Sequence, residues 1–270
     1  MSRDDARILP QARTELLTIG RRSELSVVLL HGLTNSPSQY SAFAPMLFER
    51  GINVLVPRMP EHGDRDRMTT RIAGVTPEAL VRAANEAVDV ACGLGERIGV
   101  LGISMGALLA GYCAQFRRLD VAVLIAPNFG LLRLPRFAGR LLSWGLRAFP
   151  NRFMWWDPRV RDTRRPFAAY PRFPTRVLGG TMSIADAVYD AARRQPPLTR
   201  RIVTIVNRND PAVSNAVTEQ VVKGWQRWDP QGVSYVELEN LPRHHDIVDP
   251  EQPLARTDLV YPRLLEALGA

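Results

Sequence analysis

Ser104 is the residue whose setting most clearly predicts chemistry. With Gly102 and Gly106 it matches the pattern G-x-S-x-G, between an apolar run at residues 98–101 and a helix-like run at residues 107–112. A serine in this setting lies on a tight turn from strand to helix, with its hydroxyl projecting from the edge of a sheet. Both glycines fit that turn because the neighbouring backbones come too close to leave room for side chains. The pattern therefore predicts a nucleophilic serine.

A serine hydroxyl is a weak nucleophile at neutral pH, so it needs a base and an acid that orients the base. The chain has four histidines, which are His31, His62, His244 and His245. When the serine lies on a strand-to-helix turn, the acid and then the histidine follow it along the chain. The base is therefore His244 or His245, and we interpret His31 and His62 as structural hydrogen-bonding residues.

The acid is expected between the serine and the histidine, directly after a strand. Asp210 follows the predicted strand at residues 202–206 and precedes Pro211. A carboxylate there would hold the imidazole in the required tautomer, although an aspartate before proline also suits a turn or a helix cap. Asp186 and Asp190 are further candidates, but they lie in a helical part of a long insertion.

An oxyanion that develops during attack on a carbonyl group needs backbone N–H donors. The amide of Met105, directly after the nucleophile, is expected to be one donor. The loop after the predicted strand at residues 25–30 is expected to supply the second, through the amide of Leu33. These two assignments depend on position alone, since a main-chain donor does not require a particular side chain.

Strand and helix signals alternate along the chain, which is typical of a parallel sheet with crossover helices. The predicted strands span residues 25–30, 53–56, 98–103, 121–126, 202–206 and 233–238. The predicted helices span residues 36–50, with Ser36 as the N-cap and Pro37 in the first turn, and residues 105–116, 213–225 and 253–268, while a further helix opens at Thr76. We expect an α/β fold, with a mostly parallel central sheet and helices on both faces.

One long segment interrupts this alternation. Residues 128–199 carry little strand signal and are rich in arginine, proline and aromatic residues. We expect these residues to form a mainly helical cap or lid, inserted into a core of residues 1–127 and 200–270. The aromatic rings would suit the walls of an apolar substrate pocket, or they would pack the cap onto the core.

The net charge is +8 and the predicted pI about 10.3. The positive residues are spread along the chain, with no basic block that alternates with aromatic residues, so we interpret them as solvated surface. This argues against a nucleic-acid partner and leaves open a peripheral contact with a lipid surface. No run of 18 apolar residues is present, and the N-terminus lacks an apolar signal segment, so a cytoplasmic protein is expected. No cluster has the spacing of metal ligands, and neither a metal nor an organic cofactor is expected.

Three segments resemble the carboxylesterase and monoacylglycerol-lipase-like branch of the α/β-hydrolase superfamily. Residues 31–37, HGLTNSP, resemble the oxyanion loop H-G-F-T-G-x-P of that branch, and residues 57–63, PRMPEHG, resemble its P-x-x-P-G-H-G segment. Residues 102–106 match its nucleophile elbow. The resemblance covers residues 25–127 and 200–265 and leaves out the cap. It departs from the pattern at Glu61 and Asn207, where glycine is usual.

The resemblance implies an α/β-hydrolase fold and a serine hydrolase that cleaves carboxylic esters through an acyl-enzyme. Its final histidine motif aligns best with His245, so the implied triad is Ser104, Asp210 and His245, with His244 as the alternative base. A small-molecule ester with an apolar acyl group is the implied substrate. Thioester cleavage or acyl transfer on the same fold, lipase-like hydrolysis at an interface, and ligand binding without turnover remain alternatives.

Overall fold

The computed structural model describes residues 4–131, 134–158 and 168–270. Its central sheet has seven strands in the order β1-β3-β2-β4-β5-β8-β9. All neighbouring pairs are parallel except β1 with β3 at one edge. The strands are β1 (Glu15–Leu17), β2 (Ser23–Leu30), β3 (Asn53–Val56), β4 (Gly95–Ile103), β5 (Val121–Ile125), β8 (Arg201–Asn207) and β9 (Val233–Leu238).

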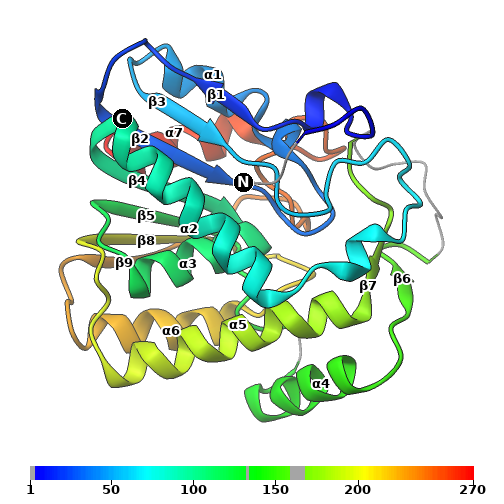
Figure 1. Ribbon diagram of the computed structural model, residues 1–270. Coiled ribbons are helices and arrows are strands. Elements are labelled where there is room, and N and C mark those ends of the chain that lie inside the picture. The colour runs from blue at the N-terminus through cyan, green and yellow to red at the C-terminus, as the bar shows by residue number, and fades with distance from the viewer. Residues whose placement is uncertain (1–3, 132–133, 159–167) are drawn as a thin grey trace.

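Helices cover both faces of the sheet (Figure 1). One face packs against α2 (Pro77–Leu94), α3 (Met105–Phe116) and α6 (Asn215–Gln226), with α5 (Thr175–Arg194) packed on these helices. The other face packs against α1 (Phe43–Phe48) and α7 (Thr257–Leu268). Alternate residues of a strand supply the two cores, because successive side chains point to opposite faces. In β2, Val28 and Leu30 belong to one core and Val27 and Leu29 to the other. The predicted α/β architecture is confirmed.

The helix expected over residues 36–50 is instead two short helices. A 3-10 helix, η2 (Pro37–Tyr40), precedes α1, and Ser36 makes no side-chain cap. Pro45 explains the division, because a proline is tolerated in the first turn of a helix but lacks the N–H that a continuous helix would need. Tyr40 is fully buried, and its hydroxyl donates to Leu30 O (2.9 Å). The last two helices also begin later than expected, at Asn215 and Thr257.

The segment between β5 and β8 contains α4 (Arg136–Ala148), a hairpin of β6 (Phe153–Trp155) with β7 (Arg172–Pro174), and α5. The helix α5 packs against α3 and α6, and α4 packs against α5. Figure 1 shows α4 as the outermost helix, with α5 between it and the sheet. The division into a core and a cap of residues 128–199 stays a prediction. Within the described ranges, no helix is long and apolar enough to span a membrane.

Candidate active site

The turn between β4 and α3 holds Ser104 in an uncommon backbone conformation, with φ 57° and ψ −115°. A Cβ on Gly102 would lie 2.2 Å from the carbonyl oxygen of Gly106, and a Cβ on Gly106 would lie 1.8 Å from Leu30 O. No side chain fits at either position, which is the reason predicted for both glycines. The strained turn presents the hydroxyl beyond the end of β4.

The structure brings Ser104, His245 and Asp210 together in one chain of hydrogen bonds. Ser104 Oγ lies 2.8 Å from His245 Nε2, and His245 Nδ1 lies 2.7 Å from Asp210 Oδ2. Because an ionised carboxylate can only accept, the Nδ1 nitrogen carries the proton of the neutral imidazole and Nε2 is left to accept from the serine. This arrangement suits proton removal from Ser104.

The loop after β8 fixes the carboxylate of Asp210. Its side chain is fully buried, and Oδ1 accepts hydrogen bonds from Ala212 N (2.8 Å) and Val213 N (3.1 Å). These two bonds leave Oδ2 directed at His245. The other two candidate acids lie elsewhere, because Asp186 and Asp190 on α5 form ion pairs with arginines of α4.

Asn207, the last residue of β8, holds the loop that carries the histidine. Its side-chain Nδ2 donates to the carbonyl oxygens of Pro242 (2.9 Å) and His244 (2.7 Å), and its Oδ1 accepts from Asn209 N (2.9 Å). The side chain is fully buried. The sequence alone presents Asn207 only as a departure from a family glycine, and nothing in its local pattern signals a contact 35 residues away.

His244 has a different setting from its neighbour. Its Nε2 lies 3.2 Å from Gln252 Oε1, and its backbone oxygen accepts from Asn207. The geometry therefore brings His245, and not His244, to the serine.

The loop after β2 lies against the nucleophile elbow. A Cβ on Gly32 would be 3.6 Å from Ser104 Cβ. Three contacts hold this loop: Gly32 N donates to Gln39 Oε1 (2.8 Å), Thr34 N donates to His62 Nε2 (3.2 Å), and Thr34 O accepts from Tyr170 N (2.7 Å). Among the described residues, no acceptor takes a hydrogen bond from the amide of Leu33 or of Met105. The amides of Leu33 and Met105 stay the predicted oxyanion donors.

His31 and His62 brace this loop from within the protein. Nε2 of His31 accepts from Met59 N (3.0 Å), and Nδ1 of each ring lies within 2.9 Å of a backbone carbonyl oxygen. Burial lowers the pKa of His62 to about 4 and that of His31 well below its usual range. Both rings are therefore neutral at pH 7, as their hydrogen bonds require.

Glu61, the other departure from the family pattern, has a left-handed backbone with φ 58°. Glycine adopts this conformation without steric cost, which explains why glycine is usual there. Two hydrogen bonds hold the loop with glutamate at this position. Tyr170 Oη donates to Glu61 O (3.1 Å) and accepts from Asp64 N (2.8 Å).

A side-chain bridge joins the loop after β2 to the histidine loop. Besides accepting from Gly32 N, Gln39 donates through Nε2 to Asp246 Oδ2 (2.7 Å), and the other Asp246 oxygen accepts from Val248 N (3.2 Å). Gln39 is buried. The residue that follows His245 is therefore tied to the residue that precedes Leu33.

Ser104 and His245 open into a pocket of about 450 Å³. Its wall is mixed, with apolar groups beside amide, imidazole and carboxylate groups: Leu33, Trp156, Ala169, Pro211 and Ala212 on the apolar side, and Asn35, Gln39, His244, Asp246 and Gln252 on the polar side. Trp156 is the aromatic residue of this lining within the described residues, and its Nε1 donates to Thr34 Oγ1 (2.8 Å). Most described aromatic residues of the 128–199 segment therefore lie outside the pocket wall.

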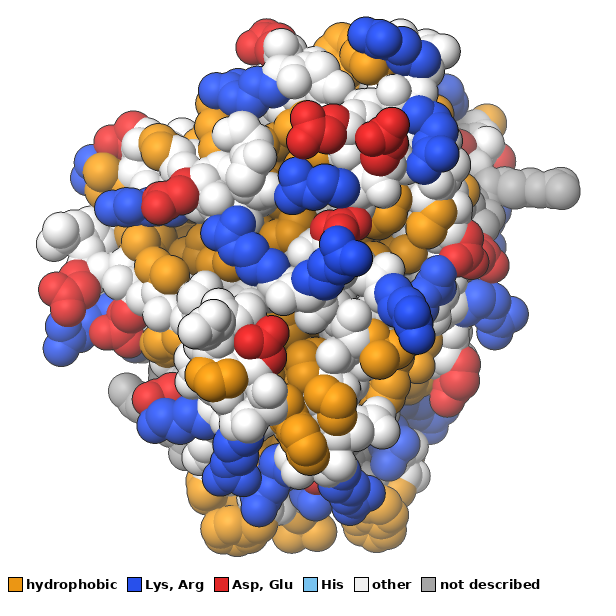
Figure 2. All heavy atoms as spheres, turned by 90° about the vertical axis from the view of Figure 1, so that its left-hand side faces the viewer, with side chains coloured by type: hydrophobic (Ala, Val, Ile, Leu, Met, Phe, Trp, Pro, Cys, Tyr) orange, Lys and Arg blue, Asp and Glu red, His pale blue; other side chains and the backbone are white. Residues whose placement is uncertain are grey.

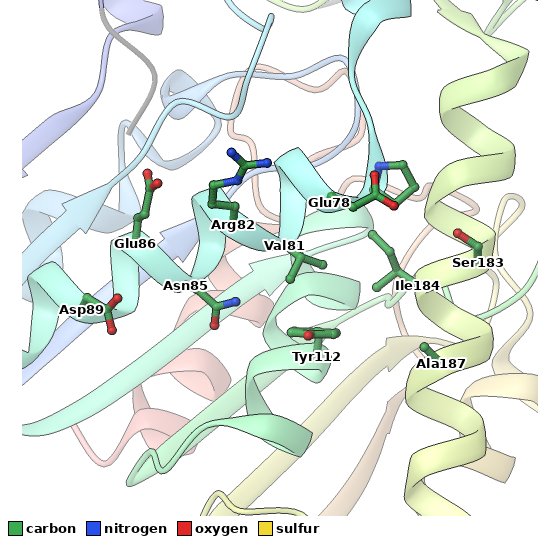
Figure 3. Close-up of a pocket in the computed structure, with 11 residues that line it drawn as sticks. Glu78, Val81, Arg82, Asn85, Glu86, Asp89, Tyr112, Ser183, Ile184 and Ala187 are labelled. Carbon is green, nitrogen blue, oxygen red and sulfur yellow. The ribbon is translucent and has the colours of Figure 1, made fainter.

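A second hollow, of about 580 Å³, lies between α2 and α5, where Val81, Tyr112 and Ile184 form its apolar floor (Figure 3). Glu86 and Asp89 project from α2 along its side. It is larger than the pocket at Ser104, yet its lining contains neither Ser104 nor a histidine. The smaller pocket is the candidate active site.

Comparison with solved structures places the chain among proteins of the same fold. A structure from a study of LipS and LipT, two metagenome-derived lipolytic enzymes, is 19% identical over 97% of this chain and 99% of that chain, with a TM-score of 0.70. The monoacylglycerol lipase of Paleococcus ferrophilus is 16% identical over 94% and 97%, with a TM-score of 0.71. Est1E from Butyrivibrio proteoclasticus, with ferulic acid bound, is 16% identical over 96% of each chain, with a TM-score of 0.61.

The comparison with curated proteins gave no significant match. A sequence model of the Alpha/beta hydrolase family, in contrast, matches residues 27–265, which include Ser104, Asp210 and His245. With this match and the shared fold, the protein belongs to the Alpha/beta hydrolase family.

Proposed function

We propose that this protein is a serine hydrolase that cleaves carboxylic esters through an acyl-enzyme intermediate. The observation that carries the proposal is the continuous hydrogen-bonded chain from Ser104 through His245 to a buried Asp210, at the mouth of a pocket. A serine, a base and an orienting acid in contact are the parts that this reaction needs.

In the proposed first step, His245 Nε2 takes the hydroxyl proton while Ser104 Oγ attacks the ester carbonyl carbon. The carbonyl oxygen becomes an oxyanion that accepts from the amides of Leu33 and Met105. As the tetrahedral intermediate collapses, the bond to the alcohol oxygen breaks and the alcohol leaves with the proton held by His245. Water then attacks the acyl-enzyme with His245 as base, which releases the acid and restores Ser104.

Two features of the fold support stabilisation of that oxyanion. Met105 is the first residue of α3, and the amino end of a helix carries a partial positive charge. The loop of Leu33 is held in place before the substrate binds, by Gln39 and His62. Fixed donors of this kind typically contribute about 3 kcal/mol each to transition-state stabilisation.

The pocket supports an ester of modest size as substrate. Its apolar wall, with Leu33 and Trp156, would accommodate an apolar acyl group, and its polar wall would suit a hydroxylated alcohol such as glycerol. Similar solved structures include a monoacylglycerol lipase, Est1E with bound ferulic acid and a yeast monoglyceride lipase in complex with a substrate analogue. We therefore propose esterase or lipase-like activity on esters with a polar alcohol.

Steady-state hydrolysis of p-nitrophenyl esters, monoacylglycerols and acyl-thioesters tests this function. We expect Ser104→Ala to reduce ester hydrolysis to the uncatalysed background, and Asp210→Asn to lower kcat by about four orders of magnitude, because the imidazole then adopts the wrong tautomer. His245→Gln should also abolish turnover, whereas His244→Gln, the matched control at the neighbouring position, should retain most of it.

Other outcomes would assign a different function to the protein. A folded protein that hydrolyses only thioesters would be a thioesterase, and one whose products shift to a new ester when an alcohol is added would be an acyltransferase. If the protein bound esters and released them unchanged, it would be a binding protein. Full ester hydrolysis by Ser104→Ala would contradict the mechanism directly.

A further inference from the structure

The helix α4 presents an apolar face to solvent. Phe137, Leu141 and Trp144, spaced four and three residues apart, have exposed fractions of 77%, 69% and 60%. This spacing places them on one side of the helix. The opposite side faces α5, where the buried Ser143 donates to Gly179 O (2.9 Å). We call Phe137, Leu141 and Trp144 the α4 face, and large apolar side chains grouped in this way mark a contact site.

Arginines flank the α4 face. Arg136, Arg140 and Arg147 lie at positions of α4 that share one side of the helix, next to the α4 face, and α4 contains no acidic residue. Arg136 and Arg140 form ion pairs with Asp186 and Asp190, which fix α4 on α5. Figure 2 shows hydrophobic side chains projecting at the lower edge of the molecule, with blue side chains beside them.

The charge of the whole molecule is concentrated in the same part of the chain. Residues 128–174 contain ten arginines and two aspartates, an excess of eight positive charges that equals the net charge of +8 of the entire protein. The rest of the chain therefore carries no net charge. Arginines also occur along the rest of the chain, whereas acidic residues are nearly absent from this segment.

We propose that the α4 face docks on a lipid surface that carries anionic headgroups. A helix with apolar and aromatic residues on one side and arginines beside them lies in the interface, with its rings among the acyl chains and its cations at the phosphates. Tryptophan suits this depth because its ring is apolar and its N–H is polar. Each arginine near an anionic surface adds attraction, and the excess charge lies in the same stretch of the sequence as the α4 face.

The α4 face fits this partner better than two others. In a symmetric dimer formed through the face, each copy would bring the same arginine-rich flank to the interface, and like charges would oppose association. A nucleic acid would satisfy the arginines but would leave Phe137, Leu141 and Trp144 exposed to water. A lipid surface would cover the apolar side chains of the α4 face and would also attract the arginines beside it.

A short stretch of chain links the α4 face to the pocket. The chain leaves α4 at Ala148, forms β6, and reaches Trp156 in the pocket wall eight residues later. This proposal does not depend on ester hydrolysis, since it concerns binding, and it is tested by binding alone.

Co-sedimentation with lipid vesicles tests the docking. The protein would be mixed with vesicles of phosphatidylcholine alone and with vesicles that contain about one third phosphatidylglycerol. The triple variant Phe137→Ser, Leu141→Ser, Trp144→Ser removes the α4 face. The matched control carries three Leu→Ser substitutions at exposed positions elsewhere, Leu16, Leu198 and Leu254, whose exposed fractions are 47%, 49% and 53%. Thermal unfolding would verify that both variants fold.

We expect the wild type and the control to bind the anionic vesicles, more weakly at high salt, and the α4-face variant to bind at least about tenfold more weakly. Equal binding of the two variants, or no binding of the wild type, would overturn the proposal. A wild type that is dimeric without lipid and monomeric in the α4-face variant would assign the face to self-association. Binding of duplex DNA but not of vesicles would assign the arginines to nucleic acid.

Discussion

At the scale of single residues, the most informative side chain is Asn207, because it holds the loop that carries the proposed base, His245, through the backbone of preceding residues. Its amide holds two carbonyl groups of the histidine loop. Asn207→Ala would leave these carbonyls unpaired and free the loop. We expect the free energy of unfolding to fall by about 1–3 kcal/mol and kcat to fall about ten- to hundredfold, since a displacement of about 1 Å in a catalytic group has that effect.

Asn53 provides a matched control for this prediction. It is also fully buried, and its Nδ2 donates to two carbonyl oxygens, of Arg21 and Leu94, while its Oδ1 accepts from Ile19 N. It lies at the opposite end of the sheet. Asn53→Ala should therefore lose similar stability in urea unfolding and keep its kcat, whereas equal kcat in both variants would show that Asn207 has only a structural role.

The sequence predicts the positions of Ser104 and Asp210. Ser104 directly follows an apolar strand, Asp210 lies shortly after another, and the acid and the histidine must follow the serine along the chain. It reduces the base to His244 or His245, and the resemblance favours His245. It could not predict the role of Asn207 or Gln39, since their partners lie far along the chain and an isolated amide side chain has no distinctive spacing.

At the scale of elements, Gln39 joins the loop of the proposed oxyanion donor Leu33 to the loop of the proposed base His245. It lies in η2, and its side chain connects Gly32 N, next to the oxyanion loop, with Asp246, next to the base. Gln39→Ala should lower kcat about tenfold with little change in KM, because the donor of Leu33 matters most in the transition state.

Gln252→Ala is the control for this bridge. Gln252 also donates to Asp246 Oδ2 (3.2 Å), yet among the described residues its side chain makes no hydrogen bond to the loop after β2. Its removal should lower kcat less than removal of Gln39. If Gln39→Ala and Gln252→Ala lost the same activity in esterase assays, the link between the two loops would not contribute to catalysis.

The longer elements were predicted best. Residues 105–116 form α3 as expected, and Thr76 caps α2 by accepting from Ala79 N (3.1 Å). The short strands β1, β6 and β7 were not predicted, because three residues are too few to show a period. The prediction of one helix over residues 36–50 was wrong, because tertiary contacts and Pro45 outweigh helix propensity there.

At the scale of the whole molecule, buried neutral histidines make stability depend on pH. The pKa of His62 is about 4 in the folded protein and about 6.5 in an unfolded chain. Between these values the unfolded chain binds a proton that the folded protein does not, so stability falls as the pH falls from 6.5 to 4. Two and a half pKa units correspond to about 3 kcal/mol.

Urea unfolding of the wild type and of His62→Gln at pH 7, 5.5 and 4.5 measures this effect. The variant lacks the titrating ring, so its stability should fall less steeply. Burial and the charge of Asp246 raise the pKa of Asp249 to about 7, which opposes the histidine effect, but Asp249 is present in both proteins and cancels in the comparison. Parallel pH profiles would contradict the prediction.

The most direct test of the central claim is the site at which a fluorophosphonate probe reacts. The wild type should gain one adduct per chain, located on Ser104 by peptide mass spectrometry, because in the proposed mechanism His245 activates that hydroxyl and the amides of Leu33 and Met105 bind the phosphoryl oxygen. Ser104→Ala should gain none, and His245→Gln should react far more slowly. A folded wild type that stays unlabelled, or that carries the adduct on a different residue, would contradict the account.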